Sequence, residues 1–223
     1  MIEVFIGSLV WILLTGLLGL FISAIFSNKL ELERKYFLIP YVLIMSVFLY
    51  FFFSLNNISF LNLIIENWIY GIVVGVIVGG FLVKTVRNQP KSQTNTGSKL
   101  IGQLLWFGVI YGIIDSLVLN VVPVVIIWKS FEMVGFTSLW WGTVIALVTS
   151  FAASIFATLL YHIGYQEFRN KSMAFVLIGN SLITIAYLIS LNPLGAILSH
   201  TIMHIAAVYQ GPETTLQLPP HLE

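Results

Sequence analysis

The sequence contains no cysteine and very little charge. Without cysteine there are no disulfides, thiolate metal ligands or iron–sulfur clusters. Asp, Glu, Lys and Arg make up 9% of the 223 residues, whereas a soluble domain carries about 25%. Hydrophobic residues make up 58% instead, and apolar runs of a length that crosses a bilayer recur along the whole chain. The composition therefore predicts a polytopic membrane protein without a soluble domain.

Polar breaks divide the chain into seven apolar segments of roughly 20 residues each. We expect one all-α, seven-helix transmembrane domain over residues 1–211 and a short cytoplasmic tail at 212–223. Pro123 is a candidate site for a kink in the fourth helix, because proline has no backbone N–H to donate. The expected helices cover residues 3–27, 36–55, 63–83, 100–127, 137–163, 172–191 and 194–210.

The basic residues predict the orientation of the chain. Nine of the ten Lys and Arg residues lie in the first, third and fifth loops, and only Lys129 lies on the other side. The positive-inside rule then places the N-terminus outside and the C-terminus in the cytoplasm. We expect an integral protein of the bacterial cytoplasmic membrane. Because topology explains the few basic residues, we expect no nucleic-acid partner.

The third expected helix contains the run "GIVVGVIVGG". Its Gly71, Gly75 and Gly79 form a stripe of small residues, which lets helix backbones approach closely in lipid. We expect this stripe to pack against another helix of the same chain.

Two histidines lie four residues apart in the last expected helix, in "LSHTIMHIAAV". With a rise of about 1.5 Å per residue, His200 lies roughly 9 Å and His204 roughly 15 Å from the outer boundary. Asp115 on the fourth helix is expected at a depth similar to that of His200, and Asn180 on the sixth near that of His204. Because polar residues inside a membrane usually face an interior cavity, these four residues predict one pocket.

A second polar cluster is expected at the cytoplasmic end of the fifth helix, in "YHIGYQEFRN". It contains His162, Tyr165, Glu167 and Arg169. The sequence leaves open whether this cluster and the histidine pair form one site or two.

Three interpretations of the histidine pair remain open. Residues at i and i+4 lie side by side on a helix, so both imidazoles can bind one Zn²⁺ ion. Alternatively, His200 and His204 hydrogen-bond to Asp115, Asn180 or backbone carbonyls and hold helices together. In the third interpretation they pass protons toward Asp115.

The HxxxH motif in the last of seven helices resembles the superfamily of alkaline ceramidases and adiponectin-receptor-like hydrolases, often called CREST. This resemblance implies that His200 and His204 bind Zn²⁺ with a third histidine on an early helix, assisted by an aspartate and a serine. The second expected helix contains no histidine, and Asp115 lies on the fourth helix rather than the third. His162 is then the candidate third ligand, if the fifth helix ends deep in the membrane.

A second resemblance is to the CPBP or Abi intramembrane proteases, whose motifs are EExxxR, FxxxH and HxxxN. The run "QEFRN" is similar to part of the first motif, which makes Glu167 a candidate catalytic residue. The run "ILSHTIMH" is similar to the last motif, with His204 in the position of the asparagine. The second glutamate and the middle motif are missing.

The leading hypothesis is a metal-dependent intramembrane hydrolase that acts on a lipid amide or ester, or on a peptide. In this hypothesis Zn²⁺ activates water, Asp115 is a general base or a further ligand, and Asn180 donates to the oxyanion. A transporter or channel with a metal-free polar pocket is the alternative. A membrane sensor or scaffold is a third possibility.

Overall fold

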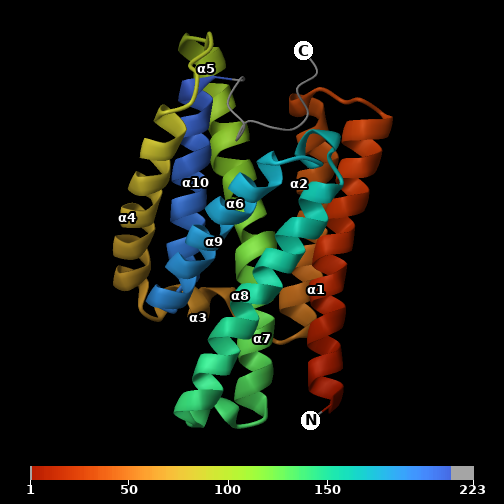
Figure 1. Cartoon of the computed structure of the whole chain (residues 1–223), viewed down its shortest axis with the longest axis vertical. Helices are drawn as coiled ribbons and strands as arrows, with labels where there is room; N and C mark the ends of the chain where they lie inside the picture. The colour runs from red at the N-terminus through yellow and green to blue at the C-terminus, as the bar shows by residue number, and fades with distance from the viewer. Residues whose placement is uncertain (1, 212–223) are drawn as a thin grey trace.

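Residues 2–211 of the computed structural model fold into helices, and this part of the chain contains no strand (Figure 1). The prediction of an all-helical protein is thus confirmed for these residues. Six helical stretches are long and apolar enough to cross a membrane, where seven were expected. The tail expected at 212–223 lies outside the described residues. The six stretches are Ile2–Lys29, Arg34–Leu55, Trp68–Arg87, Gly97–Met133, Trp140–Ile163 and Ser172–Ser190.

Some of these stretches combine several elements. The first joins α1 (Ile2–Ile22) to the π-helical turn η1 (Ser23–Lys29). The fourth joins α5 (Gly97–Gln103), η2 (Leu104–Ile110), α6 (Tyr111–Ser116), η3 (Leu117–Val121) and α7 (Val122–Met133), of which η2 and η3 are π-helical. The remaining elements are α2 (Arg34–Leu55), α3 (Phe60–Ile65), α4 (Trp68–Arg87), η4 (Phe136–Ser138), α8 (Trp140–Ile163), η5 (Gln166–Phe168), α9 (Ser172–Ser190) and α10 (Pro193–Gln210).

The helix expected at 63–83 is divided into two. α3 ends at Ile65, α4 begins at Trp68, and Asn67 lies between them in the left-handed region with φ 54°. Asparagine adopts this conformation more readily than most residues, because its short polar side chain bonds locally. The hydrophobic pattern misses the break because both flanking segments are apolar. α4 also runs on to Arg87, beyond the expected end.

The stretch Gly97–Met133 forms the centre of the molecule. In its most apolar part 83% of the residues are buried within the protein, against 28–33% in the other five stretches. The helix is longer than the expected 100–127 and continues through Pro123. This proline lies at the start of α7, directly after the wide turn η3, where a missing N–H is tolerated best.

α10 is the seventh expected helix and is not among the six apolar stretches. Polar side chains, including His200, His204 and Gln210, make it less hydrophobic. Twelve of its 18 residues are buried, and it packs against α4, α9, η2 and α6. Its buried histidines therefore lie against other helices and not on the outer surface.

Glycines bring α10 close to its neighbours. The stripe formed by Gly71, Gly75 and Gly79 is buried on α4 and faces α10, as expected from the sequence. A Cβ atom at Gly75 would lie 2.9 Å from the Cβ of Leu198 on α10. On the side of the central helix, a Cβ at Gly112 would lie 2.9 Å from the α10 backbone. The position of α10 between two glycine-containing faces is therefore tightly defined.

The connections between helices lie at two ends of the molecule (Figure 1). The connections after α1, α4 and α8 lie at the upper end of this view, and most of the basic residues lie in them or in the adjoining helix ends. The connections after α2, α7 and α9 lie at the lower end. Lys129 lies in the last turns of α7, and its Nζ donates a hydrogen bond to the carbonyl of Asn56, the residue that follows α2.

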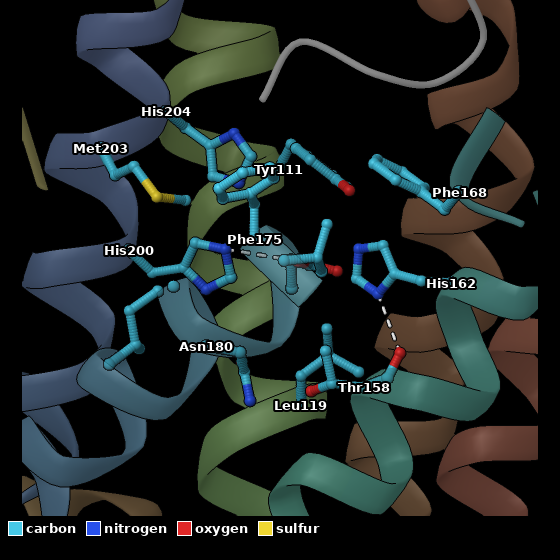
Figure 2. Close-up of a pocket in the computed structure, with 14 residues that line it drawn as sticks. Tyr111, Leu119, Thr158, His162, Phe168, Phe175, Asn180, His200, Met203 and His204 are labelled. Carbon is cyan, nitrogen blue, oxygen red and sulfur yellow. Dashed lines mark hydrogen bonds and ion pairs between the residues drawn. The ribbon is translucent and has the colours of Figure 1, made fainter. Parts of the chain in front are cut away.

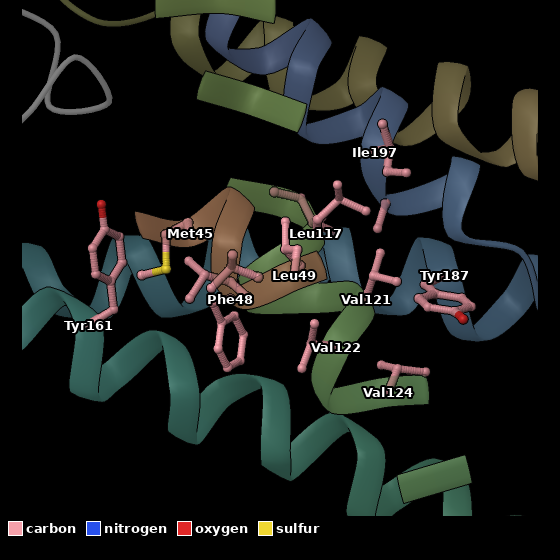
Figure 3. Packing of buried hydrophobic residues seen from close by; sticks show 14 of the residues in the cluster. Met45, Phe48, Leu49, Leu117, Val121, Val122, Val124, Tyr161, Tyr187 and Ile197 are labelled. Carbon is pink, nitrogen blue, oxygen red and sulfur yellow. The ribbon is translucent and has the colours of Figure 1, made fainter. Parts of the chain in front are cut away.

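An apolar core joins α2, the central helix and α8 (Figure 3). Met45, Phe48 and Leu49 of α2 are buried there with Val121 and Val122 of the central helix. In contrast, the outer faces of α1, α2, α4 and α8 carry many exposed Leu, Ile, Val and Phe side chains. Such an apolar exterior is suited to a lipid environment.

Candidate metal centre

The two histidines of α10 face the interior side by side. His200 and His204 are both buried. Their rings are stacked, with centroids 4.8 Å apart and planes 23° from parallel. This arrangement follows from the helix, because residues four apart lie one above the other on the same face.

Asp115 of α6 meets this pair from the central helix. Its Oδ2 lies 3.4 Å from Nε2 of His200, and its Oδ1 accepts a hydrogen bond of 2.5 Å from the hydroxyl of Tyr41 on α2. The carboxylate is buried. The expectation that Asp115 and His200 share a depth is therefore confirmed.

Asp115, His200 and His204 can hold a metal ion. Each offers one ligand atom, and the three atoms lie within 4.8 Å of one another. Ligands at about 2.1 Å from a tetrahedral ion lie roughly 3.4 Å apart, so small side-chain movements complete the coordination. The Nδ1 atoms of both histidines are buried and lack a hydrogen-bond partner in residues 2–211. Unsatisfied buried imidazole nitrogens and a buried carboxylate are the donors that Zn²⁺ binds.

A cavity of about 50 Å³ lies beside these three residues. Because a water molecule needs about 10–15 Å³ of such space, the cavity has room for a few waters or a small reacting group. His162 of α8 lies on the wall opposite His200 (Figure 2). The other lining residues are Tyr111, Leu119, Thr158, Phe168, Phe175, Val176, Gly179, Asn180, Ile183 and Met203.

Of the cluster expected at the end of the fifth helix, His162 lines the same cavity as the histidine pair. Its Nδ1 donates a hydrogen bond of 2.8 Å to the carbonyl of Thr158, so its Nε2 carries the lone pair. The group of three ligand atoms within 4.8 Å of one another does not include His162. In the same cluster, Glu167 and Arg169 are not among the cavity-lining residues.

Asn180 lines the cavity, but its side chain is engaged elsewhere. Its Nδ2 donates to the hydroxyls of Ser154 at 3.2 Å and Thr184 at 3.5 Å, and its Oδ1 accepts from Asn120 at 2.8 Å. Figure 2 shows Asn180 on the His200 side of the cavity rather than at the level of His204. An oxyanion role would require its amide to leave these partners.

Tyrosines surround the centre, and of these the sequence had singled out only Tyr165. Tyr41 holds Asp115, and the ring of Tyr111 meets that of His204 edge to face at 4.8 Å between centroids. The Tyr165 hydroxyl donates to Tyr161 at 2.6 Å. Burial raises the pKa of the Tyr165 phenol well above its ordinary value, which keeps this donor protonated.

No family model matches this chain, and no curated protein and no solved structure matches it either. The resemblances to CREST hydrolases and to CPBP proteases therefore stay predictions from residue patterns. The geometry of the site is the basis for assigning a function.

Proposed function

We propose that this protein is an integral membrane hydrolase with a divalent metal ion, Zn²⁺ first among the candidates, held by Asp115, His200 and His204. Its substrate would be a lipid amide or ester, or a peptide bond. The observation that carries the proposal is the burial of these three metal-binding groups together, beside a cavity with room for water.

Each residue around the centre has a role in this proposal. When bound, Zn²⁺ supplies Lewis-acid chemistry that activates water and polarises a carbonyl. Tyr41 fixes the orientation of the Asp115 carboxylate through its hydrogen bond, as outer-shell partners of metal ligands do. His162 lies across the cavity with a lone pair on Nε2 and accepts a proton from the attacking water.

We propose that the chain crosses the membrane seven times, through the six apolar stretches and, as an inner seventh crossing, through α10. The basic connections share one end of the molecule, and we assign that end to the cytoplasm, with the N-terminus outside. A bacterial cytoplasmic membrane is the proposed location.

The metal is tested by elemental analysis of protein purified in detergent without a histidine tag. We expect about one zinc per chain and its loss in the His200→Ala/His204→Ala double variant. Ser199→Ala is the matched control, because Ser199 is buried on the same helix and its hydroxyl bonds only to α10 carbonyls. No metal in the wild type, or full retention in the double variant, would refute the site.

Hydrolysis is tested separately, once metal is found. Removal of the metal by a chelator should abolish cleavage of lipid amides, lipid esters or peptides, and added Zn²⁺ should restore it. The His162→Gln variant should keep the metal and lose turnover, because it removes the proton acceptor but none of the three ligands. Unchanged turnover in His162→Gln would refute its role.

A metal-free transporter is the second candidate, and one contact favours it. The pair of His200 and Asp115, 3.4 Å apart, can bind and release a proton without a metal ion. In that case the purified protein contains no zinc. Flux in proteoliposomes then depends on pH and is lost in Asp115→Asn.

A further inference from the structure

The half-buried side chain of Arg34 lies near the candidate metal centre, and no acidic residue among residues 2–211 forms an ion pair with it. Arg34 is the first residue of α2. Its guanidinium carbon lies 5.2 Å from the ring centroid of Phe107 and 5.8 Å from that of Tyr111. Its Nε and Nη1 atoms are buried and have no hydrogen-bond partner in residues 2–211.

No carboxylate in the described residues forms an ion pair with Arg34, although the charge of Asp115 acts on it at longer range. The nearest acidic residue in sequence, Glu33, forms its ion pair with Lys35 at 2.6 Å. Asp115 is engaged with Tyr41 and His200. Buried charges and buried N–H groups in proteins are nearly always paired, so the unpaired Nε and Nη1 atoms of Arg34 indicate an anionic ligand.

The chemistry and position of Arg34 favour a phosphate group. A planar guanidinium binds phosphate through parallel N–H···O bonds, and the two aromatic rings fix its plane. Arg34 begins a membrane-crossing stretch at the end of the molecule that carries the basic connections. Lipid phosphates lie at that level of a membrane, and basic pockets between helices bind them.

The ligand would lie next to the cavity. The Tyr111 ring contacts the Arg34 guanidinium and also the His204 ring, at 4.8 Å between centroids. Tyr111 also lines the cavity. A headgroup held by Arg34 is therefore separated from the candidate metal ligands by a single aromatic ring.

We propose that Arg34 binds the phosphate of an anionic phospholipid, beside the metal centre. If the proposed hydrolase function holds, the substrate is then a phosphate-bearing lipid whose scissile bond extends past Tyr111 into the cavity. The binding of the phosphate is independent of that function.

The test is native mass spectrometry of the detergent-purified protein with added phosphatidylglycerol or, separately, phosphatidylcholine. We expect phosphatidylglycerol adducts in the wild type and an at least tenfold weaker population in Arg34→Gln. Lys35→Gln is the matched control, because this neighbouring cation is exposed and paired with Glu33. It should bind lipid like the wild type. Equal adducts in wild type and Arg34→Gln would overturn the proposal.

Further arms separate the alternatives. Arg34→Lys keeps the positive charge but loses the planar guanidinium that binds phosphate through two parallel hydrogen bonds. If Arg34→Gln fails to fold, Arg34→Lys takes its place in the test. Phosphatidylglycerol adducts of Arg34→Lys that are as abundant as those of the wild type would then overturn the proposal. Stabilisation by inorganic phosphate without any lipid adduct would overturn the lipid source. The His200→Ala/His204→Ala variant should lose zinc and keep phosphatidylglycerol, whereas Arg34→Gln should keep zinc. Failure of the phosphate site and failure of the metal site are thereby distinguished.

Discussion

The close approach of α4 to α10 leads to a testable difference between two glycines of one helix. A Cβ atom at Gly75 would lie 2.9 Å from the Cβ of Leu198 and 3.0 Å from the carbonyl oxygen of Leu194. A Cβ at Gly80 would have no such atom within 4 Å. Gly75→Ala must therefore push α10 away, whereas Gly80→Ala points into open space.

The magnitude follows from the geometry. Carbon atoms pack at about 3.5–4.0 Å, so the 2.9 Å approach at Gly75 requires a shift of roughly 0.5–1 Å. Both variants gain the same helix propensity, and their difference isolates the overpacking cost of about 1–3 kcal/mol. Since 1 kcal/mol changes Tm by about 2–4 °C in a chain of this size, Gly75→Ala should melt roughly 2–12 °C below Gly80→Ala.

The same displacement reaches the candidate metal centre, because α10 carries His200 and His204. Metal–ligand distances tolerate only about 0.2 Å, so Gly75→Ala should also retain less zinc than Gly80→Ala. The measurements are thermal melting in detergent and zinc content of the two variants side by side. Equal or higher Tm in Gly75→Ala would refute the close packing of α4 on α10.

Three other predictions follow from single contacts or from topology. Tyr41→Phe removes the hydrogen bond to the buried Asp115 carboxylate and should weaken zinc affinity about 10–100-fold. Competition with a chelator measures this affinity, and an unchanged value would contradict a supporting role for Tyr41. Asn192→Ala deletes a fully buried amide that donates to three carbonyls of the α3 region. It should cost about 1–3 kcal/mol, measured as a lower Tm. Because the chain has no cysteine, single introduced cysteines can report which side of the membrane a connection lies on. In intact cells a membrane-impermeant maleimide should label Ser138→Cys and not Asn95→Cys. The reverse labelling pattern would show that the proposed orientation is wrong.

The sequence predicts much of this fold because a bilayer allows few solutions. Long apolar runs must be helical when every backbone group has to be satisfied internally, so the helices lie close to their expected positions. Local backbone chemistry is harder to predict. The left-handed Asn67 between α3 and α4 and the π turns around Asp115 leave no mark in a hydrophobic pattern.

The residues of the candidate site could be singled out from the sequence, but their grouping and surroundings could not: His162 was the candidate third ligand, whereas Asp115 is the residue grouped with the two histidines. Histidines and an aspartate in apolar helices are costly, so His200, His204 and Asp115 stand out. Tyr41 and Tyr111 do not, because tyrosine is common in membrane helices and only the packing of α2 and α6 shows which ones meet the centre. Arg34 is similarly hidden, since a basic residue at a helix end is already explained by topology.

α10 connects the fold to the proposed chemistry. The histidines that bind the metal in the proposed site are also the residues that make α10 too polar to count among the apolar stretches. Such a helix is stable at membrane depth only if other helices surround it, and glycines on α4 and on the central helix provide the space. Replacing both histidines with leucine should therefore make α10 more apolar and leave its packing on α4 intact. The variant should fold, with a Tm no lower than that of the double alanine variant, and contain no zinc. A double leucine variant that failed to fold would show that the histidines are needed for structure and not only for the site.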